Sequence, residues 1–171
     1  KTPASCAGVI TVGATGVDGS RAFYSNYGLN VALSAPGGGG TASGSTLDAS
    51  NVIWSTGNTG TTTPVASADG GDVYVGMVGT SMASPHVAGV AALIQSTAVA
   101  AGQPALTPAL VRQVLTKTAR SFPSPAPTVP MGTGIVDANA AVLMAKGVVM
   151  PDPATMLTNR SARQITSASK N

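Results

Sequence analysis

One serine in this chain stands where a nucleophile could act. The stretch "MVGTSMASPHVAGVAALI", residues 77–94, surrounds Ser81 with small residues and then continues as an apolar run. A serine hydroxyl is a poor nucleophile at neutral pH, so it needs a base within hydrogen-bonding reach and donors for the oxyanion that forms after attack. The chain contains a single histidine, His86, five positions further on. The chemistry of Ser81 therefore depends on where its base comes from.

His86 is badly placed to be that base. The apolar spacing after Ser81 predicts a helix from residue 81 to about residue 101. Five residues of α-helix add about 7.5 Å of rise and about 500° of rotation, so the two side chains point to different sides. We interpret His86 as a packing or hydrogen-bonding residue of a buried helix. Because the chain has no second histidine, its own residues cannot complete a Ser-His-Asp arrangement.

The residues just before Ser81 fit an oxyanion site. A predicted strand over residues 73–79 fixes their position, and Gly79 lets a substrate backbone approach. The start of the helix, at Thr80 and Ser81, offers free N–H groups and a favourable dipole. A serine that only caps a helix is the commoner occupant of such a position. Position alone leaves both readings open.

Short strands followed by helices predict an α/β fold. Apolar or alternating runs indicate strands over residues 6–15, 21–28, 30–40, 51–57 and 73–79, with a further short strand within 132–147. Beyond the helix at 81–101, Thr107 and Pro108 open a second helix, and Asp137 and Gly147 bound a third. Six short strands with one late cluster of helices look like part of a sheet whose first half is absent.

Composition narrows the classes of function. Of 171 residues, 43% are hydrophobic and 9% charged, and glycine is abundant, which suggests a secreted protein with tight turns. The basic residues are scattered, so no nucleic-acid footprint is present. No run approaches the roughly 18 apolar residues of a membrane span. Cys6 is the only cysteine, so it is either a buried thiol or half of a bridge to another polypeptide.

The stretch around Ser81 resembles a family signature. "GTSMASPHVAGVAALI" fits the pattern Gly-Thr-Ser-x-Ala-x-Pro-His-x-x-Gly of the subtilases, the subtilisin-like serine proteases. The segments "PASCAGVITVGAT", "AFYSNYG", "VALSAPGG" and "GTGIVDANAAV" look like that family's segments, in its order. The resemblance covers about residues 2–147. It implies the C-terminal half of a catalytic domain over 1–147, with 148–171 as an extension or tail.

The resemblance implies what the site contains. The fold would be the C-terminal part of a subtilisin-like three-layer α/β fold with a mainly parallel central sheet, incomplete without an N-terminal segment. Ser81 would be the nucleophile, with Thr80, Gly79 and Met82 around the oxyanion and substrate, and His86 would keep a structural place. In subtilases the triad Asp and His precede the Ser in the chain, as does the Asn that supplies an oxyanion donor.

Those three residues are expected on an N-terminal piece of the same protease. The chain then represents either an enzyme nicked after its oxyanion Asn and still docked, which we favour, or an expressed fragment. Alone it is expected to be inactive. Cys6 is a candidate for a disulfide to the missing piece. We expect no nucleic-acid or membrane partner, and protein or peptide substrates.

No cofactor is expected for the chemistry, and no metal ligands are assigned in this chain. The resemblance leaves room for a structural calcium ion, mainly in the missing half. Ala32 stands where several family members place an aspartate, and Val78 stands where the pattern often has asparagine. Asp69 and Asp72 lie in a glycine-rich loop, where two carboxylates are usually just solvated.

Three functions compete for this sequence. The leading hypothesis is a secreted serine endopeptidase that forms an acyl-enzyme through Ser81. A catalytically inactive subtilase-like module for binding or structure is the alternative. A lipase or esterase is disfavoured, because those enzymes centre the serine in Gly-x-Ser-x-Gly, whereas here it stands in Gly-Thr-Ser-Met-Ala.

Overall fold

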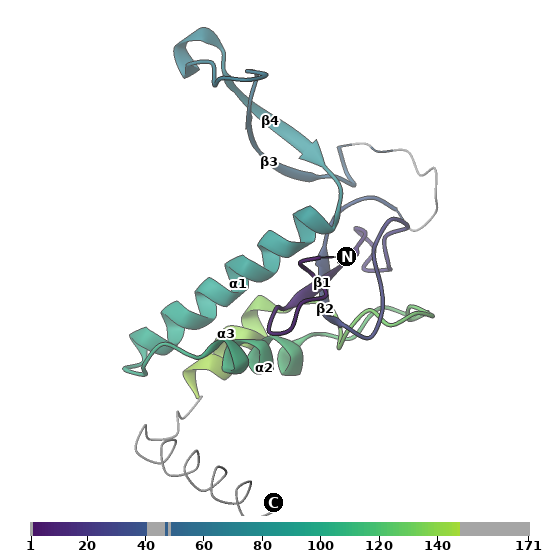
Figure 1. Cartoon of the computed structure of the whole chain (residues 1–171), viewed down its shortest axis with the longest axis vertical. Coiled ribbons are helices and arrows are strands. Elements are labelled where there is room, and N and C mark those ends of the chain that lie inside the picture. Colours follow the sequence, from purple (N-terminus) through teal and green to yellow (C-terminus); the bar gives the residue numbers. More distant parts are fainter. Residues whose placement is uncertain (1, 41–46, 48, 148–171) are drawn as a thin grey trace, which may run out of the picture.

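The computed structural model describes residues 2–40, 47 and 49–147 (Figure 1). The predicted tail or extension over 148–171 lies outside the described residues. Within the described ranges the elements follow in the order β1 (Thr11–Thr15), β2 (Val31–Pro36), β3 (Ile53–Asn58), the 3-10 turn η1 (Ser67–Asp69), β4 (Asp72–Met77), α1 (Thr80–Ala100), α2 (Pro108–Thr118) and α3 (Ala138–Lys146). Strands come first and helices last, as the sequence predicts.

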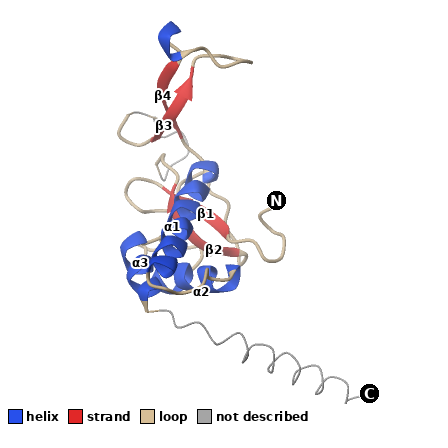
Figure 2. Cartoon of the chain, turned by 90° about the vertical axis from the view of Figure 1, so that its left-hand side faces the viewer, coloured by secondary structure: helices blue, strands red, loops and turns tan. Residues whose placement is uncertain are grey.

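The strands form two separate pairs. β1 and β2 pair in parallel, and every residue of β2 but the last is buried, which explains its unbroken apolar run. Ile135 forms isolated bridges to Ser34 of β2 (parallel) and to Arg120 (antiparallel), so the short strand predicted within 132–147 shrinks to bridges at this one residue. β3 and β4 pair antiparallel into a hairpin that projects away from the rest of the chain (Figure 2).

Helix α1 packs across the parallel pair and holds the core together. Its buried residues recur at helical spacing and contact the apolar side chains of β1 and β2: Ala83, Val87, Val90, Ile94 and Ala98. α3 lies against α1, and α2 lies against α3. This packing fixes the first turn of α1 relative to the end of β2.

The helix ends follow the predicted local chemistry. The Thr107 side chain caps α2, with Pro108 in its first turn, and Asp137 Oδ1 accepts the amide of Ala140 at 2.9 Å to cap α3. Past the end of α1, Gly102 adopts a φ of 76°, a left-handed conformation that favours glycine. The three predicted helices are confirmed to within one or two residues.

Two predicted strand segments are wrong. Residues 21–28 form an isolated bridge at Arg21 and a turn at residues 23 and 24 instead of a strand. The hydroxyl of Ser25 accepts the amide of Ala14 at 2.8 Å, and the Ser25 amide donates to the carbonyl oxygen of Ala22 at 2.9 Å. These bonds, one within the segment and one to β1, take the place of a strand ladder. Residues 6–10 also lie outside β1, since the left-handed φ of 84° at Gly8 turns the backbone.

Cys6 lies in this N-terminal turn and is exposed within this chain. The bridge to another polypeptide stays a prediction. None of the helices in the described ranges combines the length and apolarity that crossing a bilayer requires.

Candidate active site

Ser81 is exposed as the second residue of α1, which begins three residues after β4 ends at Met77. The first backbone amides of a helix have no partner inside that helix, so N–H groups around Ser81 point out of its end. The serine therefore stands in solvent, at the positive end of a helix of 21 residues, where developing negative charge is stabilised.

Ser81 is not the residue that caps α1. The N-cap is Gly79, whose carbonyl oxygen accepts the amides of Met82 at 3.0 Å and Ala83 at 3.2 Å. No side chain supplies a cap hydrogen bond there. A serine near the start of a helix is commonly its N-cap, but Ser81 does not have that role. Its hydroxyl is left available for chemistry.

Gly79 sits in a conformation that favours glycine. Its φ is 156°, which side-chain-bearing residues rarely adopt. A Cβ built there would meet only ordinary contacts, the closest to Ser81 N at 3.6 Å and Met82 Sδ at 3.7 Å. The glycine is therefore required by backbone conformation rather than by lack of space. The turn places the sulfur of Met82 beside Gly79, and Thr80 is half-buried at the first helical position.

His86 does not face Ser81. Its Nδ1 donates a hydrogen bond to the carbonyl oxygen of Met82 at 2.8 Å, one turn back along α1. The prediction of a hydrogen-bonding histidine fits this contact, but the side chain is exposed rather than buried within this chain. Pro85 lacks an N–H, so the carbonyl of Ser81 also receives no amide from the next turn. His86 is a local helix residue in this structure.

The start of α1 is tied directly to the end of β2. The backbone amide of Gly79 donates to the carbonyl oxygen of Gly37 at 2.9 Å. A Cβ at Gly37 would lie 2.6 Å from Ala14 Cβ and 2.7 Å from Gly79 O, distances that atoms do not tolerate. Only glycine fits where these two backbones meet.

Sequence reasoning missed Tyr24 as a neighbour of this turn. Its hydroxyl donates to the carbonyl oxygens of Gly37 and Gly38, at 2.7 Å and 2.6 Å. Burial raises the pKa of Tyr24 above its ordinary value, and the nearby backbone of Gly79 partly opposes that shift. No local signal in the sequence pointed to this contact, because Tyr24 and Gly37 are far apart in the chain and residues 21–28 were expected to form a strand.

The two residues next to Ser81 in the chain line different hollows. Met82 lines one of ≈ 320 Å³, which is completed by Ile53, Trp54, Ser55, Met77, Pro85 and His86. Thr80 lines another of ≈ 310 Å³, whose rim includes the exposed side chains of Tyr27 and Leu29. The two residues that flank the serine in the chain therefore face different hollows.

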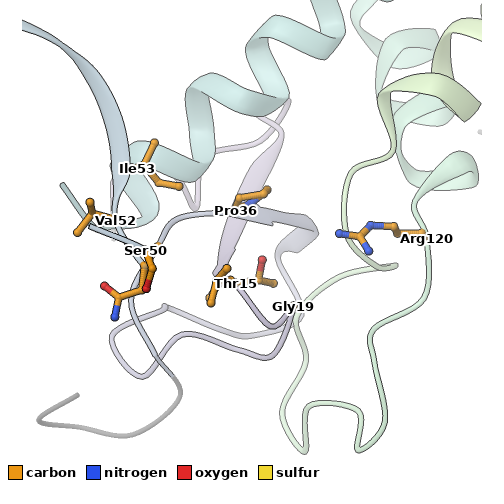
Figure 3. A pocket seen from close by; sticks show the side chains of 11 residues that line it. Thr15, Gly19, Pro36, Ser50, Val52, Ile53 and Arg120 are labelled. Atoms are coloured by element: carbon orange, nitrogen blue, oxygen red, sulfur yellow. The ribbon is translucent and has the colours of Figure 1, made fainter. Parts of the chain in front are cut away.

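A third hollow lies apart from the serine. Figure 3 shows this space of ≈ 240 Å³, where Thr15 and Pro36 face Val52 and Ile53, with Arg120 at its edge. None of the residues expected to do chemistry lines it. The candidate site is thus the exposed start of α1.

The described residues bring no metal-binding cluster together. Nowhere in those ranges do three or more His, Cys, Asp or Glu side chains gather around a common point. At the tip of the hairpin, Asp72 accepts a hydrogen bond from the hydroxyl of Ser67 at 2.5 Å. Asp72 is thus engaged in a turn.

The family of the chain is shown by a match that spans most of its length. The family model Peptidase_S8, described as the subtilase family, matches residues 1–149. The chain belongs to the subtilase family. The signature that surrounds Ser81, Met82 and His86 lies inside the matched range.

Two relatives of this subtilase chain have names that state an activity. An "Extracellular protease" of Xanthomonas campestris is 48% identical over 143 residues, which are 84% of this chain and 21% of that protein. An "Extracellular basic protease" of Dichelobacter nodosus is 43% identical over 140 residues, 82% of this chain and 20% of that protein. The chain thus spans about a fifth of the length of these relatives.

A solved structure confirms the fold of this subtilase chain. A protease from Pseudoalteromonas arctica matches with a TM-score of 0.68 and 44% identity, over 84% of this chain and 38% of that one. The chain therefore folds as part of a subtilisin-like α/β domain, as its sequence predicts.

Proposed function

We propose that this chain is the nucleophile-bearing part of a secreted serine endopeptidase. The observation that carries the proposal is the place of Ser81, exposed on a glycine-bounded turn at the start of α1 in a chain of the subtilase family. The protease names of its relatives and the low charge of the chain support an extracellular setting.

In this reaction, Ser81 Oγ attacks the carbonyl carbon of the scissile peptide bond and gives its proton to a histidine base. Negative charge then develops on the carbonyl oxygen, near the free N–H groups of the first turn of α1. Collapse expels the amine, which takes the proton from that histidine, and leaves an acyl group on Ser81. Water then releases the acid and restores the serine.

The base comes from polypeptide outside these 171 residues. His86 is the one histidine of the chain, and its Nδ1 proton is held by the carbonyl of Met82. We therefore place the triad Asp and His, and the Asn that assists the oxyanion, on an N-terminal segment that docks against this chain. The reaction needs no cofactor, and a structural calcium ion is expected mainly in that segment.

The surface of α1 supports this docking. The helix carries no Asp, Glu, Lys or Arg, and many of its small or apolar residues are exposed, among them Pro85, Ala88, Gly89, Ala92 and Leu93. A helix that is apolar all round is normally buried on every side. Within the described residues β2 is the one strand that pairs with β1, and Arg21 adds only an isolated bridge at Thr15. A further strand and a covering segment complete both surfaces.

The hollows beside Ser81 support a substrate that crosses the serine. A peptide lying over the start of α1 has space on the Thr80 side and on the Met82 side. We assign these two hollows to the residues on either side of the cleaved bond.

The experiment compares Ser81→Ala with Ser84→Ala in the complete protease. Both serines are exposed on α1, which makes Ser84 the matched control. Ser81→Ala is expected to lower peptide hydrolysis on the order of 10⁶-fold, as for the triad serine of subtilisin, while Ser84→Ala keeps its turnover. Normal hydrolysis by Ser81→Ala would overturn the proposal and favour the inactive binding module. The intact mass of the native protein shows whether the segment that carries the triad Asp and His is covalently joined to Lys1 or docked as a separate polypeptide.

A further inference from the structure

Tyr24 reaches the nucleophile turn from a distant part of the sequence. It lies in the turn between β1 and β2, half-buried, with the ring of Phe23 packed edge-on at a centroid distance of 5.3 Å. Its hydroxyl donates to the carbonyl oxygens of Gly37 and Gly38. A hydroxyl has one proton, so the two oxygens share a single donor.

The oxygen held by Tyr24 also holds the start of α1. Gly37 O accepts the amide of Gly79 at 2.9 Å, and Gly79 O in turn accepts the amides of Met82 and Ala83. A short chain of hydrogen bonds therefore runs from the Tyr24 hydroxyl through Gly37 and Gly79 to the first turn of α1. Ser81 lies within that turn.

The glycine run needs such a support. Gly38 and Gly39 have φ of 76° and 77°, and glycines pay the largest entropy cost for being held in one conformation. A Cβ at Gly37 would lie 2.9 Å from the Tyr24 hydroxyl oxygen. A larger residue at position 37 therefore cannot fit beside the tyrosine and hold the glycine run in its place. The run is held from outside by backbone hydrogen bonds, from Gly37 N to Thr15 O at 2.9 Å and from Phe23 N to Gly40 O at 3.2 Å. To these bonds Tyr24 adds a side-chain donor at Gly37 and Gly38.

We propose that Tyr24 is a positioning residue for the nucleophile, because its hydroxyl holds the Gly37 and Gly38 carbonyls and thereby sets the orientation of the turn that carries Ser81. This inference rests on the proposed function. Reaction rates fall steeply when a nucleophile is displaced by fractions of an ångström, since attack requires close and aligned atoms. Tyr24 itself touches no reacting atom.

The first test is Tyr24→Phe in the complete protease, with Tyr74→Phe as the control. Tyr74 is 78% exposed on the projecting hairpin and makes none of these contacts. For Tyr24→Phe, kcat per titrated active site is expected to fall by about tenfold or more, with KM within about twofold. Phosphonylation of Ser81 slows in parallel. Tyr74→Phe changes none of these values.

A purely structural role would lower the unfolding temperature of Tyr24→Phe while leaving kcat per titrated site and the phosphonylation rate unchanged. That result would overturn the inference. Ser81→Ala, prepared in the same way, distinguishes failure of the proposed function from failure of the role of Tyr24. An active Ser81→Ala refutes the proposed function, whereas an inactive Ser81→Ala with a fully active Tyr24→Phe refutes only the role of Tyr24.

A second variant keeps the test decisive if Tyr24→Phe fails to fold. Incorporation of 3-fluorotyrosine at position 24 keeps the ring and the hydroxyl but lowers the pKa of the phenol. Since a phenolate cannot donate to carbonyl oxygens, the alkaline limb of kcat should move to lower pH, and the same replacement at Tyr74 should not move it. An unmoved alkaline limb would overturn the inference.

Other ionisable groups are the same in both proteins of that comparison. Residues 37–40 and 78–82, which surround the Tyr24 hydroxyl, carry no ionisable side chain. Asp18 and Arg21 lie on the turn that bears Tyr24, and His86 is the titratable group of α1. A difference between the fluorinated and unmodified proteins therefore reports on the Tyr24 hydroxyl.

Discussion

The backbone amide of Gly79 donates to the carbonyl oxygen of Gly37 at 2.9 Å, so the end of β2 and the start of α1 meet through a single backbone hydrogen bond. These residues are far apart in the sequence. Their contact sets where the helix end, and with it Ser81, lies relative to the parallel strands.

Gly37→Ala is expected to destabilise the protein by about 1–3 kcal/mol, because the new Cβ would overlap the backbone of Gly79 and the Cβ of Ala14. Denaturant unfolding measures the change. Gly147→Ala is the control, since a Cβ there meets only Met144 O at 3.8 Å. Equal stability of the two variants would contradict the close approach.

Tyr24 should contribute to stability in a pH-dependent way. Its pKa is raised above 10.0 by burial, so at high pH the folded chain keeps a proton that the unfolded chain has lost. The free energy of unfolding is then at its full value below about pH 10 and falls as pH rises through the folded pKa. Tyr24→Phe should flatten this decline in unfolding titrations, and Tyr74→Phe should not. If the free energy of unfolding of Tyr24→Phe declines equally at high pH, other ionisable groups cause the decline.

Met82 should make the enzyme sensitive to peroxide. Its sulfur lies beside Gly79, so a polar sulfoxide would crowd the oxyanion position while leaving the core intact. Turnover is expected to fall as Met82 oxidises, with little change in the unfolding temperature, and Met82→Ala or Met82→Ser should resist. Peptide mass mapping follows each methionine, and Met144, which is 37% exposed on α3, serves as the internal control. Full activity after complete oxidation of Met82 would show that its side chain lies elsewhere.

His86→Ala should affect folding more than chemistry. The substitution removes one hydrogen bond, from Nδ1 to the Met82 carbonyl, and is expected to cost about 1 kcal/mol of stability. The measurement pairs denaturant unfolding with kcat per titrated active site, which should change by less than about threefold. A fully folded His86→Ala with a loss as large as that of Ser81→Ala would give His86 a role in the reaction.

Features set by neighbouring residues could be predicted from the sequence. The caps at Thr107 and Asp137 and the left-handed Gly102 depend on a few adjacent residues, so the helices were predicted closely. The signature around Ser81 likewise predicted the family. These features depend on a few adjacent residues, so they can be recognised without knowing which distant segments the fold brings together.

Features set by distant contacts could not be predicted. The conformation of residues 21–28 depends on Ser25 bonding to Ala14, and the Tyr24 hydroxyl reaches the carbonyl oxygen of Gly37. The capping of α1 by Gly79 likewise accompanies its φ of 156° and its amide hydrogen bond to Gly37, and does not follow the preference of serine for helix ends. Each requires knowing which segments the fold brings together.

Covalent labelling of Ser81 tests the central claim most directly. The complete protease is treated with an organophosphonate, then digested and mapped by peptide mass. We predict one phosphonyl group per active molecule, located on Ser81, with loss of activity in proportion to the label and no label on Ser84. Complete inactivation with the phosphonyl group on another residue, or full labelling of Ser81 with activity retained, would contradict the account.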